Sequence, residues 1–178
     1  TPIAVVGIVM KIFGIVVSVV IGISLGGQPV IGYNLGAGNT ERVKETVSVI
    51  LKLVLAVGVV AFLIFELLPD MVIGIFGSDN SPEYMEYARL CIRIFLGGII
   101  LTCFIKSASI ILQSMGNSVK STLLALFRDV LIFVPASLIL AAVSESIVTM
   151  LWAAVISDVI SAVIGVFFLT GAIRKQAL

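Results

Sequence analysis

The chain has 178 residues, of which 60% are hydrophobic and 12% are charged, and its mean hydropathy is +1.27. Soluble domains carry about 25% charged residues, so this composition excludes a soluble globular domain and indicates an integral membrane protein. The net charge of +1 gives no sign of a nucleic-acid partner, and the absence of histidine removes the commonest metal ligand and proton shuttle.

Apolar runs predict five transmembrane helices, because about 20 apolar residues suffice to cross a bilayer. In chain order the spans cover about residues 3–35, 43–68, 84–115, 119–143 and 147–173. The expected fold class is all-α, a polytopic membrane helix bundle that forms one unit over residues 1–178. The first and third spans exceed about 30 residues, or about 45 Å of straight helix, so they must tilt, kink or project beyond the bilayer.

The first span ends in a glycine-rich polar segment, and we predict that its helix is interrupted near Gly26–Pro29. In lipid, such backbone is tolerated only where it is buried in protein or faces water. A small-residue packing face, Gly32-x-x-x-Gly36, explains the same pattern equally well. Gly36–Asn39 is predicted to be the helix C-cap and turn. The candidate pathway residues of this segment are Gln28, Pro29, Tyr33 and Asn34.

The connection between the second and third spans contains a short apolar stretch, Met71–Phe76. Its length is too small to span a bilayer, so we expect a helix that lies along the membrane surface. Gly77–Ser81 follows as a turn that caps the third span.

Four charged residues lie deep in the predicted spans, where each costs about 2.5–3.5 kcal/mol on insertion scales. Lys106 lies ten residues before the turn at Gly116, and Asp129 lies nine residues after Lys120. These depths match on neighbouring helices, so we expect Lys106 to pair with Asp129. Three roles stay open: ties that hold the helices together, residues of a substrate or ion path, or side chains that extend toward the lipid headgroups. The four residues are Lys106, Arg128, Asp129 and Asp158.

Among these, Asp158 lies nearest the middle of the membrane and is the carboxylate most suited to proton coupling, although a helix-packing hydrogen bond explains it too. The sequence shows no metal-ligand cluster and no nucleophile–base pair, so no catalytic residue and no enzyme activity are predicted.

Charges in the connections predict the orientation. The connections after the first and third spans and the C-terminal tail carry lysine and arginine, whereas the other two connections carry carboxylates, among them Asp79 and Glu145. Basic connections stay on the cytoplasmic side, so we expect a cytoplasmic C-terminus and an external Thr1. The chain then has an odd number of spans, and we expect at least one further helix before Thr1. The basic residues are Arg42, Lys44, Lys120, Arg174 and Lys175.

Several motifs resemble those of one family. Gln28–Asn39 followed by Arg42-Val43-Lys44 resembles the QPIIGYNYGAxxxxRVK signature of multidrug and toxin extrusion (MATE) transporters. Leu112–Asn117 resembles the family's QAxGxxxxS turn, and Leu126–Asp129 with Pro135 resembles its LLRQxxxxxP helix. Ser157-Asp158 matches a common SD pair in the last helix.

The resemblance implies a twelve-helix fold of two lobes, of which this chain would be helices eight to twelve, the C-terminal lobe without its first helix. It implies secondary active export of organic, often cationic, drugs in exchange for H⁺ or Na⁺, with no cofactor beyond that coupling ion. Expected partners are a small-molecule substrate, the lipid bilayer and the missing N-terminal lobe, and the expected location is the inner (plasma) membrane. Residues 88–113 contain no carboxylate, so the cation-binding acid that some branches place there has no counterpart.

Two other functions stay open. A flippase for lipid-linked saccharides shares the broader superfamily fold, but such a protein holds pyrophosphate with several deep arginines and lysines. A non-transporting membrane scaffold subunit would place its polar residues only at packing or lipid-facing positions.

Overall fold

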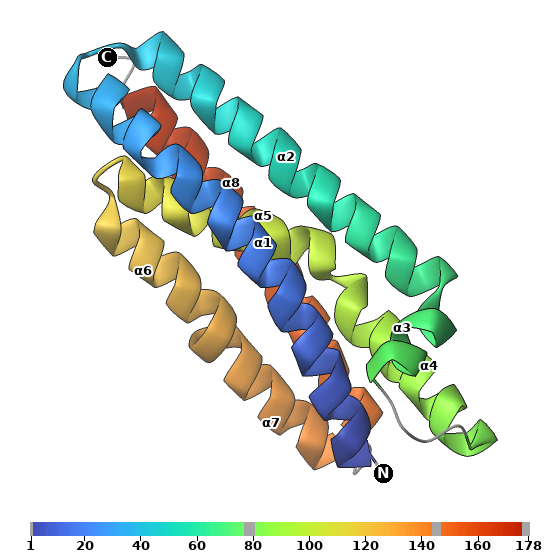
Figure 1. The fold of residues 1–178 in the computed structure, drawn as a ribbon. Coiled ribbons are helices and arrows are strands. Elements are labelled where there is room, and N and C mark those ends of the chain that lie inside the picture. The colour runs from blue at the N-terminus through green and yellow to red at the C-terminus, as the bar shows by residue number, and fades with distance from the viewer. Residues whose placement is uncertain (1, 77–80, 144–146, 176–178) are drawn as a thin grey trace.

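The computed structural model describes residues 2–76, 81–143 and 147–175, and these residues form an elongated bundle of helices without strands (Figure 1). Five helical stretches are long and apolar enough to cross a membrane, and they match the five predicted spans. The all-α fold class is therefore confirmed. The elements are α1 (Pro2–Gly36), α2 (Thr40–Leu67), α3 (Pro69–Phe76), α4 (Pro82–Gly97), α5 (Ile99–Ser114), α6 (Ser118–Leu126), the π-helix η1 (Phe127–Ile132), α7 (Phe133–Val143) and α8 (Ile147–Lys175).

The long helices run up and down in an antiparallel order (Figure 1). The turn between α1 and α2, the turn between α5 and α6 and the C-terminal end of α8 lie at one end of the bundle. The N-terminal end of α1, the short helix α3 and the far end of α7 lie at the opposite end. The basic connections are thus gathered at one end, as the alternating charge pattern predicts.

Both turns at the basic end have the same geometry. Gly38 and Gly116 adopt positive φ angles of 71° and 76°, which glycine tolerates because it has no Cβ. The amide of Asn39 donates to the carbonyl of Asn34 at 2.9 Å, and the amide of Asn117 donates to the carbonyl of Leu112 at 2.9 Å. Each turn is therefore a Schellman-type helix end. The predicted C-cap at residues 36–39 is confirmed.

The predicted interruption of the first span is wrong. Helix α1 runs without a break from Pro2 to Gly36, with Pro29 inside it. Proline removes one hydrogen bond, and the helix continues past that loss for seven residues, to Gly36. The small-residue face is also not used within this chain, because no other element lies within 4 Å of the Cβ positions of Gly32 and Gly36.

Gly27 and Gly58 permit close contacts between helices. A Cβ on Gly27 of α1 would lie 2.2 Å from Cδ1 of Ile50 on α2. A Cβ on Gly58 of α2 would lie 3.2 Å from the backbone Cα of Ile100 on α5. Close packing through small residues thus does hold this bundle together, at positions different from those predicted.

Helix α5 lies at the centre of the bundle and supplies much of its core. Its buried side chains include Ile105, Ile111 and Leu112, and the helix packs against α1, α2, α6 and α8. The buried hydroxyl of Ser24 on α1 donates to Ser107 on α5 at 2.9 Å. Such contacts fix the rotation of α5, which in turn determines where its polar residues point.

The third and fourth spans each contain a local irregularity. The third span divides at Gly98, which separates α4 from α5. The fourth contains the π-helix η1 between α6 and α7. Pro135 has no N–H to offer to the carbonyl of Leu131, and its ring crowds that carbonyl. The helix loosens just before this proline, and π-helical turns of this kind are frequent at functional sites.

The end of the bundle opposite the basic turns contains two ion pairs that the sequence interpretation missed. The guanidinium of Arg89 on α4 contacts both carboxylate oxygens of Asp70 on α3. Arg93 pairs with Glu66 of α2, with an Nε–Oε1 distance of 3.5 Å. The Arg89–Asp70 pair ties α3 to α4, and the Arg93–Glu66 pair ties α4 to α2. The short helix predicted at Met71–Phe76 is confirmed as α3, and its position along the membrane surface stays a prediction. Of the turn predicted at Gly77–Ser81, residues 77–80 lie outside the described residues, as do Asp79 and Glu145, and Ser81 is the N-cap residue of α4.

Candidate functional site

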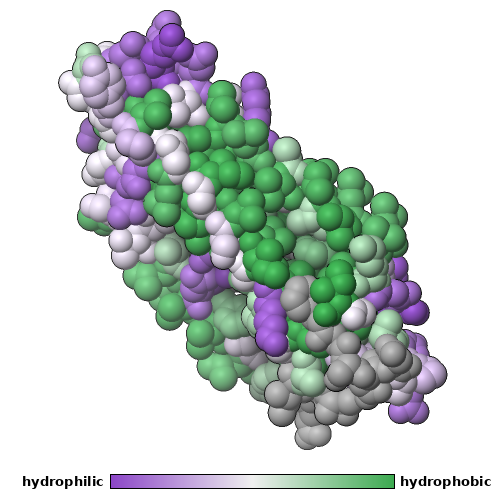
Figure 2. Space-filling model, viewed as in Figure 1, coloured by the Kyte–Doolittle hydropathy of each residue, from purple (hydrophilic) through white to green (hydrophobic). Residues whose placement is uncertain are grey.

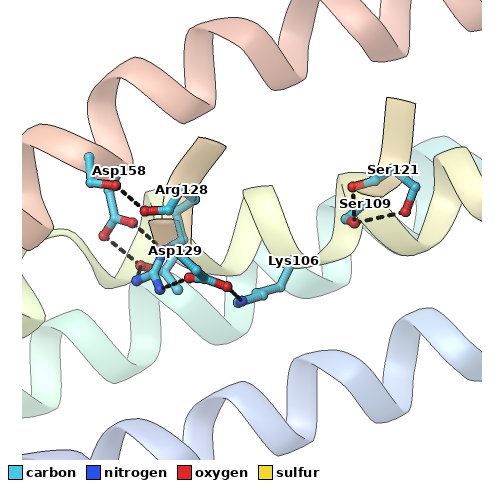
Figure 3. Close-up of polar contacts among 8 residues, drawn as sticks. Lys106, Ser109, Ser121, Arg128, Asp129 and Asp158 are labelled. Atoms are coloured by element: carbon cyan, nitrogen blue, oxygen red, sulfur yellow. Dashed lines mark hydrogen bonds and ion pairs between the residues drawn. The ribbon is translucent and has the colours of Figure 1, made fainter. Parts of the chain in front are cut away.

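The predicted pair between Lys106 and Asp129 is confirmed. Nζ of Lys106 on α5 lies 3.0 Å from Oδ2 of Asp129 on η1 (Figure 3). The two residues come from antiparallel helices at equal depth, so their side chains meet without any bend in α5. Their pairing places a lysine and a carboxylate inside the membrane-spanning region.

Arg128 connects this pair to α8. Its Nη1 donates to Oδ1 of Asp129 at 2.7 Å, and its Nε donates to Oδ1 of Asp158 at 2.8 Å. The hydroxyl of Thr102 on α5 donates to Oδ2 of Asp158 at 2.6 Å and accepts a 3.4 Å hydrogen bond from Nη2 of Arg128. One guanidinium is therefore shared between two carboxylates, one from η1 and one from α8 (Figure 3).

The group formed by Lys106, Arg128, Asp129 and Asp158, here called the charge network, contains two cations and two carboxylates. Arg128 is 14% exposed and Asp158 is 2% exposed. Removing such charges from water costs several kcal/mol per ion, and only close pairing with full hydrogen bonding offsets this cost. The network meets that requirement because each carboxylate accepts at least two hydrogen bonds.

Local backbone features position these side chains. Gly98 lies opposite Asp158, because a Cβ on Gly98 would be 2.8 Å from Oδ2 of that carboxylate. The hydroxyl of Ser157 donates to the backbone carbonyl of Arg128 at 2.6 Å. This carbonyl belongs to the π-helix, so a side chain of α8 satisfies an acceptor in the irregular turn.

A cavity of about 210 Å³ lies beside the charge network. Arg128 and Asp129 form its polar side, and the Arg128 guanidinium lies 5.6 Å from the ring centroid of Phe13, within range of a cation–π interaction. Phe13 also packs edge-on against Phe95, with ring centroids 5.5 Å apart. The remaining lining residues are Met10, Phe133, Ala154 and Ser157.

The four candidates of α1 do not join this network. None of them lines the cavity or bonds to a network residue among the contacts of the described chain. Tyr33 is 79% exposed and Pro29 is exposed on the same helix end. The Asn34 amide donates to the carbonyl of Val30 at 2.8 Å, a local helix contact, and Gln28 is half-buried. The structure thus brings together Lys106, Arg128, Asp129 and Asp158 and leaves the α1 candidates apart.

Three contributors were missed by the sequence interpretation. Thr102 lies one helical turn before Lys106, and this spacing on one face of α5 was a usable signal. Gly98 and Phe13 gave no signal, because a glycine or a phenylalanine in an apolar run is ordinary in a membrane helix. Within the described residues there is no group of three or more carboxylate or thiol side chains that could hold a metal ion.

Comparison with known protein families shows to which family the chain belongs. A family model described as MatE matches residues 1–139 of the chain. The chain belongs to the MatE family. This places its multi-pass membrane fold among MATE transporters and confirms the resemblance seen in its motifs. Comparison with curated proteins gives no match.

Solved MATE structures share the fold. A MATE multidrug resistance transporter of the MOP superfamily in an outward-facing conformation aligns with a TM-score of 0.87 at 19% identity, over 98% of this chain and 39% of that one. An inward-facing conformation aligns with a TM-score of 0.83 at 19% identity, over 95% of this chain and 39% of that one. A MATE in complex with MaL6 gives a TM-score of 0.88 at 19% identity, over 98% and 39%. The chain therefore spans about two fifths of the length of these transporters.

Proposed function

We propose that residues 1–178 are helices eight to twelve of a MATE exporter, in the C-terminal lobe. The order of the motifs supports this assignment, as does the 39% of each solved MATE transporter that the chain covers. The intact protein then exports organic, often cationic, compounds in exchange for H⁺ or Na⁺, together with its N-terminal lobe. It lies in the inner membrane with the basic turns and the C-terminus on the cytoplasmic side.

The observation that carries this proposal is the charge network beside the cavity. Arg128 is shared between Asp129 and Asp158. When a proton or cation binds one carboxylate, that carboxylate attracts the guanidinium less, and Arg128 then pairs with the other. Because Asp158 belongs to α8, and Lys106 and Thr102 belong to α5, such a shift changes the ties among α5, η1 and α8. We infer that the intact protein has a second arrangement of these helices, which binding of the coupling ion favours.

The cavity offers an organic molecule aromatic rings and a carboxylate at one place. Phe13 and Phe133 provide apolar walls, and the half-exposed carboxylate of Asp129 can bind a cationic group by exchanging its contact with Lys106. A flippase is less well supported, because Lys106 and Arg128 both pair with carboxylates, which leaves the charge network no uncompensated positive charge to hold a pyrophosphate. The same arrangement contains no nucleophile–base pair, which favours transport over catalysis.

Transport by the intact protein in proteoliposomes tests this function. We expect Asp129→Asn to reduce export of a fluorescent cationic dye driven by an H⁺ or Na⁺ gradient, because it removes a carboxylate of the charge network. Pro29→Ala should also reduce export if the C-terminal end of α1 bends at this proline during the transport cycle. Lys44→Gln, at an exposed site outside the network, is the control. Normal dye export by Asp129→Asn at equal protein density would contradict the role of the network, and no dye export by the unsubstituted protein under either gradient would contradict the function.

A further inference from the structure

A continuous groove runs along the outside of α1 and α2, separate from the charge network. Its first part, of about 330 Å³, is lined by Arg42, Glu45 and Thr46 near the α1–α2 turn. Its second part, of about 390 Å³, has only apolar walls, among them Val19 and Val57. Ile23 and Leu53 line both parts, so the two hollows form one groove.

The groove changes from polar to apolar along its length. Figure 2 shows hydrophilic surface at the end of the molecule where α1 meets α2, followed by an extended hydrophobic surface along the bundle. Ala56 lies fourteen residues from Arg42 on α2, or about 21 Å along the helix. This distance equals half of a bilayer of about 40–45 Å, from the headgroup region to the midplane. The part of the groove between Arg42 and Ala56 therefore matches the length of one lipid in one leaflet, and the apolar part continues along α2 as far as Ile64.

The polar end contains one charge of each sign. Nη1 of Arg42 lies 3.0 Å from Oε2 of Glu45, and the two side chains are 66% and 63% exposed. Such exposed pairs contribute little to stability, so both groups can exchange this contact for a ligand. A phosphate suits Arg42, and an ammonium with N–H donors suits Glu45. A headgroup with a negative charge alone meets the Glu45 carboxylate and is repelled.

We propose that the α1–α2 groove binds one zwitterionic phospholipid whose phosphate contacts Arg42 and whose primary ammonium contacts Glu45. One acyl chain follows the groove past Leu53 to Ala56 and Val57. The close approach of Gly27 to Ile50 forms the floor beneath the headgroup end. This site differs in position and ligand from the charge network, and it stands whether or not the network carries the coupling ion.

Native mass spectrometry of the intact transporter tests the site. The protein is extracted in mild detergent and offered equal amounts of phosphatidylethanolamine, phosphatidylcholine and phosphatidylglycerol. We expect phosphatidylethanolamine to be retained in preference to the other two. Arg42→Gln should lower its retention about fivefold, which corresponds to about 1 kcal/mol for one basic residue at a lipid headgroup.

Matched variants separate the two ends of the groove. Ala56→Trp fills the apolar part and should also reduce lipid retention, whereas Leu55→Trp, which lies outside the groove, and Lys44→Gln should leave retention unchanged. Glu45→Gln should abolish the preference for phosphatidylethanolamine over phosphatidylglycerol. The exposed charge variants keep the test valid even if a tryptophan variant fails to fold. Equal retention of all three lipids, or equal retention by Ala56→Trp and Leu55→Trp, would overturn the proposal, as would a groove occupied by another helix of the protein.

Discussion

Gly98 and Asp158 approach so closely that a methyl group on Gly98 would lie 2.8 Å from Oδ2 of the carboxylate. The break between α4 and α5 thus lies next to Asp158, which is the only acidic residue of α8 among residues 147–175. The absence of a side chain at residue 98 leaves room for Asp158 to reach both Thr102 and Arg128.

This contact makes Gly98→Ala a sharp test of the geometry. The new methyl group must displace Asp158, so we expect a loss of about 1–3 kcal/mol in stability. Thermal unfolding of the detergent-solubilised transporter measures this loss. Gly97→Ala is the matched control, because no atom lies within 4 Å of its Cβ position. Equal unfolding temperatures for the two variants would show that Asp158 does not occupy this place.

The pairing of Lys106 with Asp129 predicts a measurable coupling energy. In a double-mutant cycle, Lys106→Gln and Asp129→Asn should be non-additive by about 0.5–3 kcal/mol, because each single variant leaves the other charge without this partner. The cycle is measured by unfolding of the purified protein. Lys44→Gln combined with Asp129→Asn provides the control and should be additive. If the unfolding free energies of Lys106→Gln and Asp129→Asn simply added, the two side chains would not be in contact.

Charge balance within the network gives a third prediction. Arg128→Gln and Asp158→Asn each leave one uncompensated charge among buried groups, and each should cost about 3–5 kcal/mol. The double variant restores neutrality and leaves the Lys106–Asp129 pair intact, so it should unfold at a higher temperature than either single variant. A double variant less stable than both would indicate that the individual hydrogen bonds, not the balance of charges, hold α8 in place.

The contact between α1 and α2 gives a fourth prediction. Gly27→Ala should destabilise the bundle, because its Cβ would lie 2.2 Å from Cδ1 of Ile50. Ile50→Ala in the same protein should restore part of the loss by removing the obstructing atoms. Gly26→Ala, whose Cβ meets no atom within 4 Å, should be neutral in unfolding experiments. If Gly26→Ala and Gly27→Ala behaved alike, the close crossing would be absent.

The number of helices and one ion pair of the site could be predicted from the sequence. Helix ends follow from the lengths of apolar runs, and the Lys106–Asp129 pair follows from counting residues back from a shared turn. The pair between Arg128 and Asp158 could not be predicted, because it depends on the rotation of α8 and on the π-helix. The sequence does not encode either feature in a periodic pattern.

The interpretation of the first span failed for a related reason. Pro29 and its neighbouring glycines weaken a helix locally, yet tertiary contacts with α2 and α5 keep α1 continuous. Local propensity is a weak guide where packing along a long helix competes with it. The residues around Pro29 therefore marked the family more reliably than they marked the polar site.

The π-helix η1 also affects how relatives of this chain can be compared. A π-turn closes its hydrogen bonds over five residues instead of four, so it accommodates one extra residue between the same two points of a helix. A relative with an uninterrupted α-helix here would need a one-residue gap in any alignment near Phe127–Ile132. Without that gap, every residue of the following segment, from Phe133 on, would be equated with a neighbour about 100° around the helix.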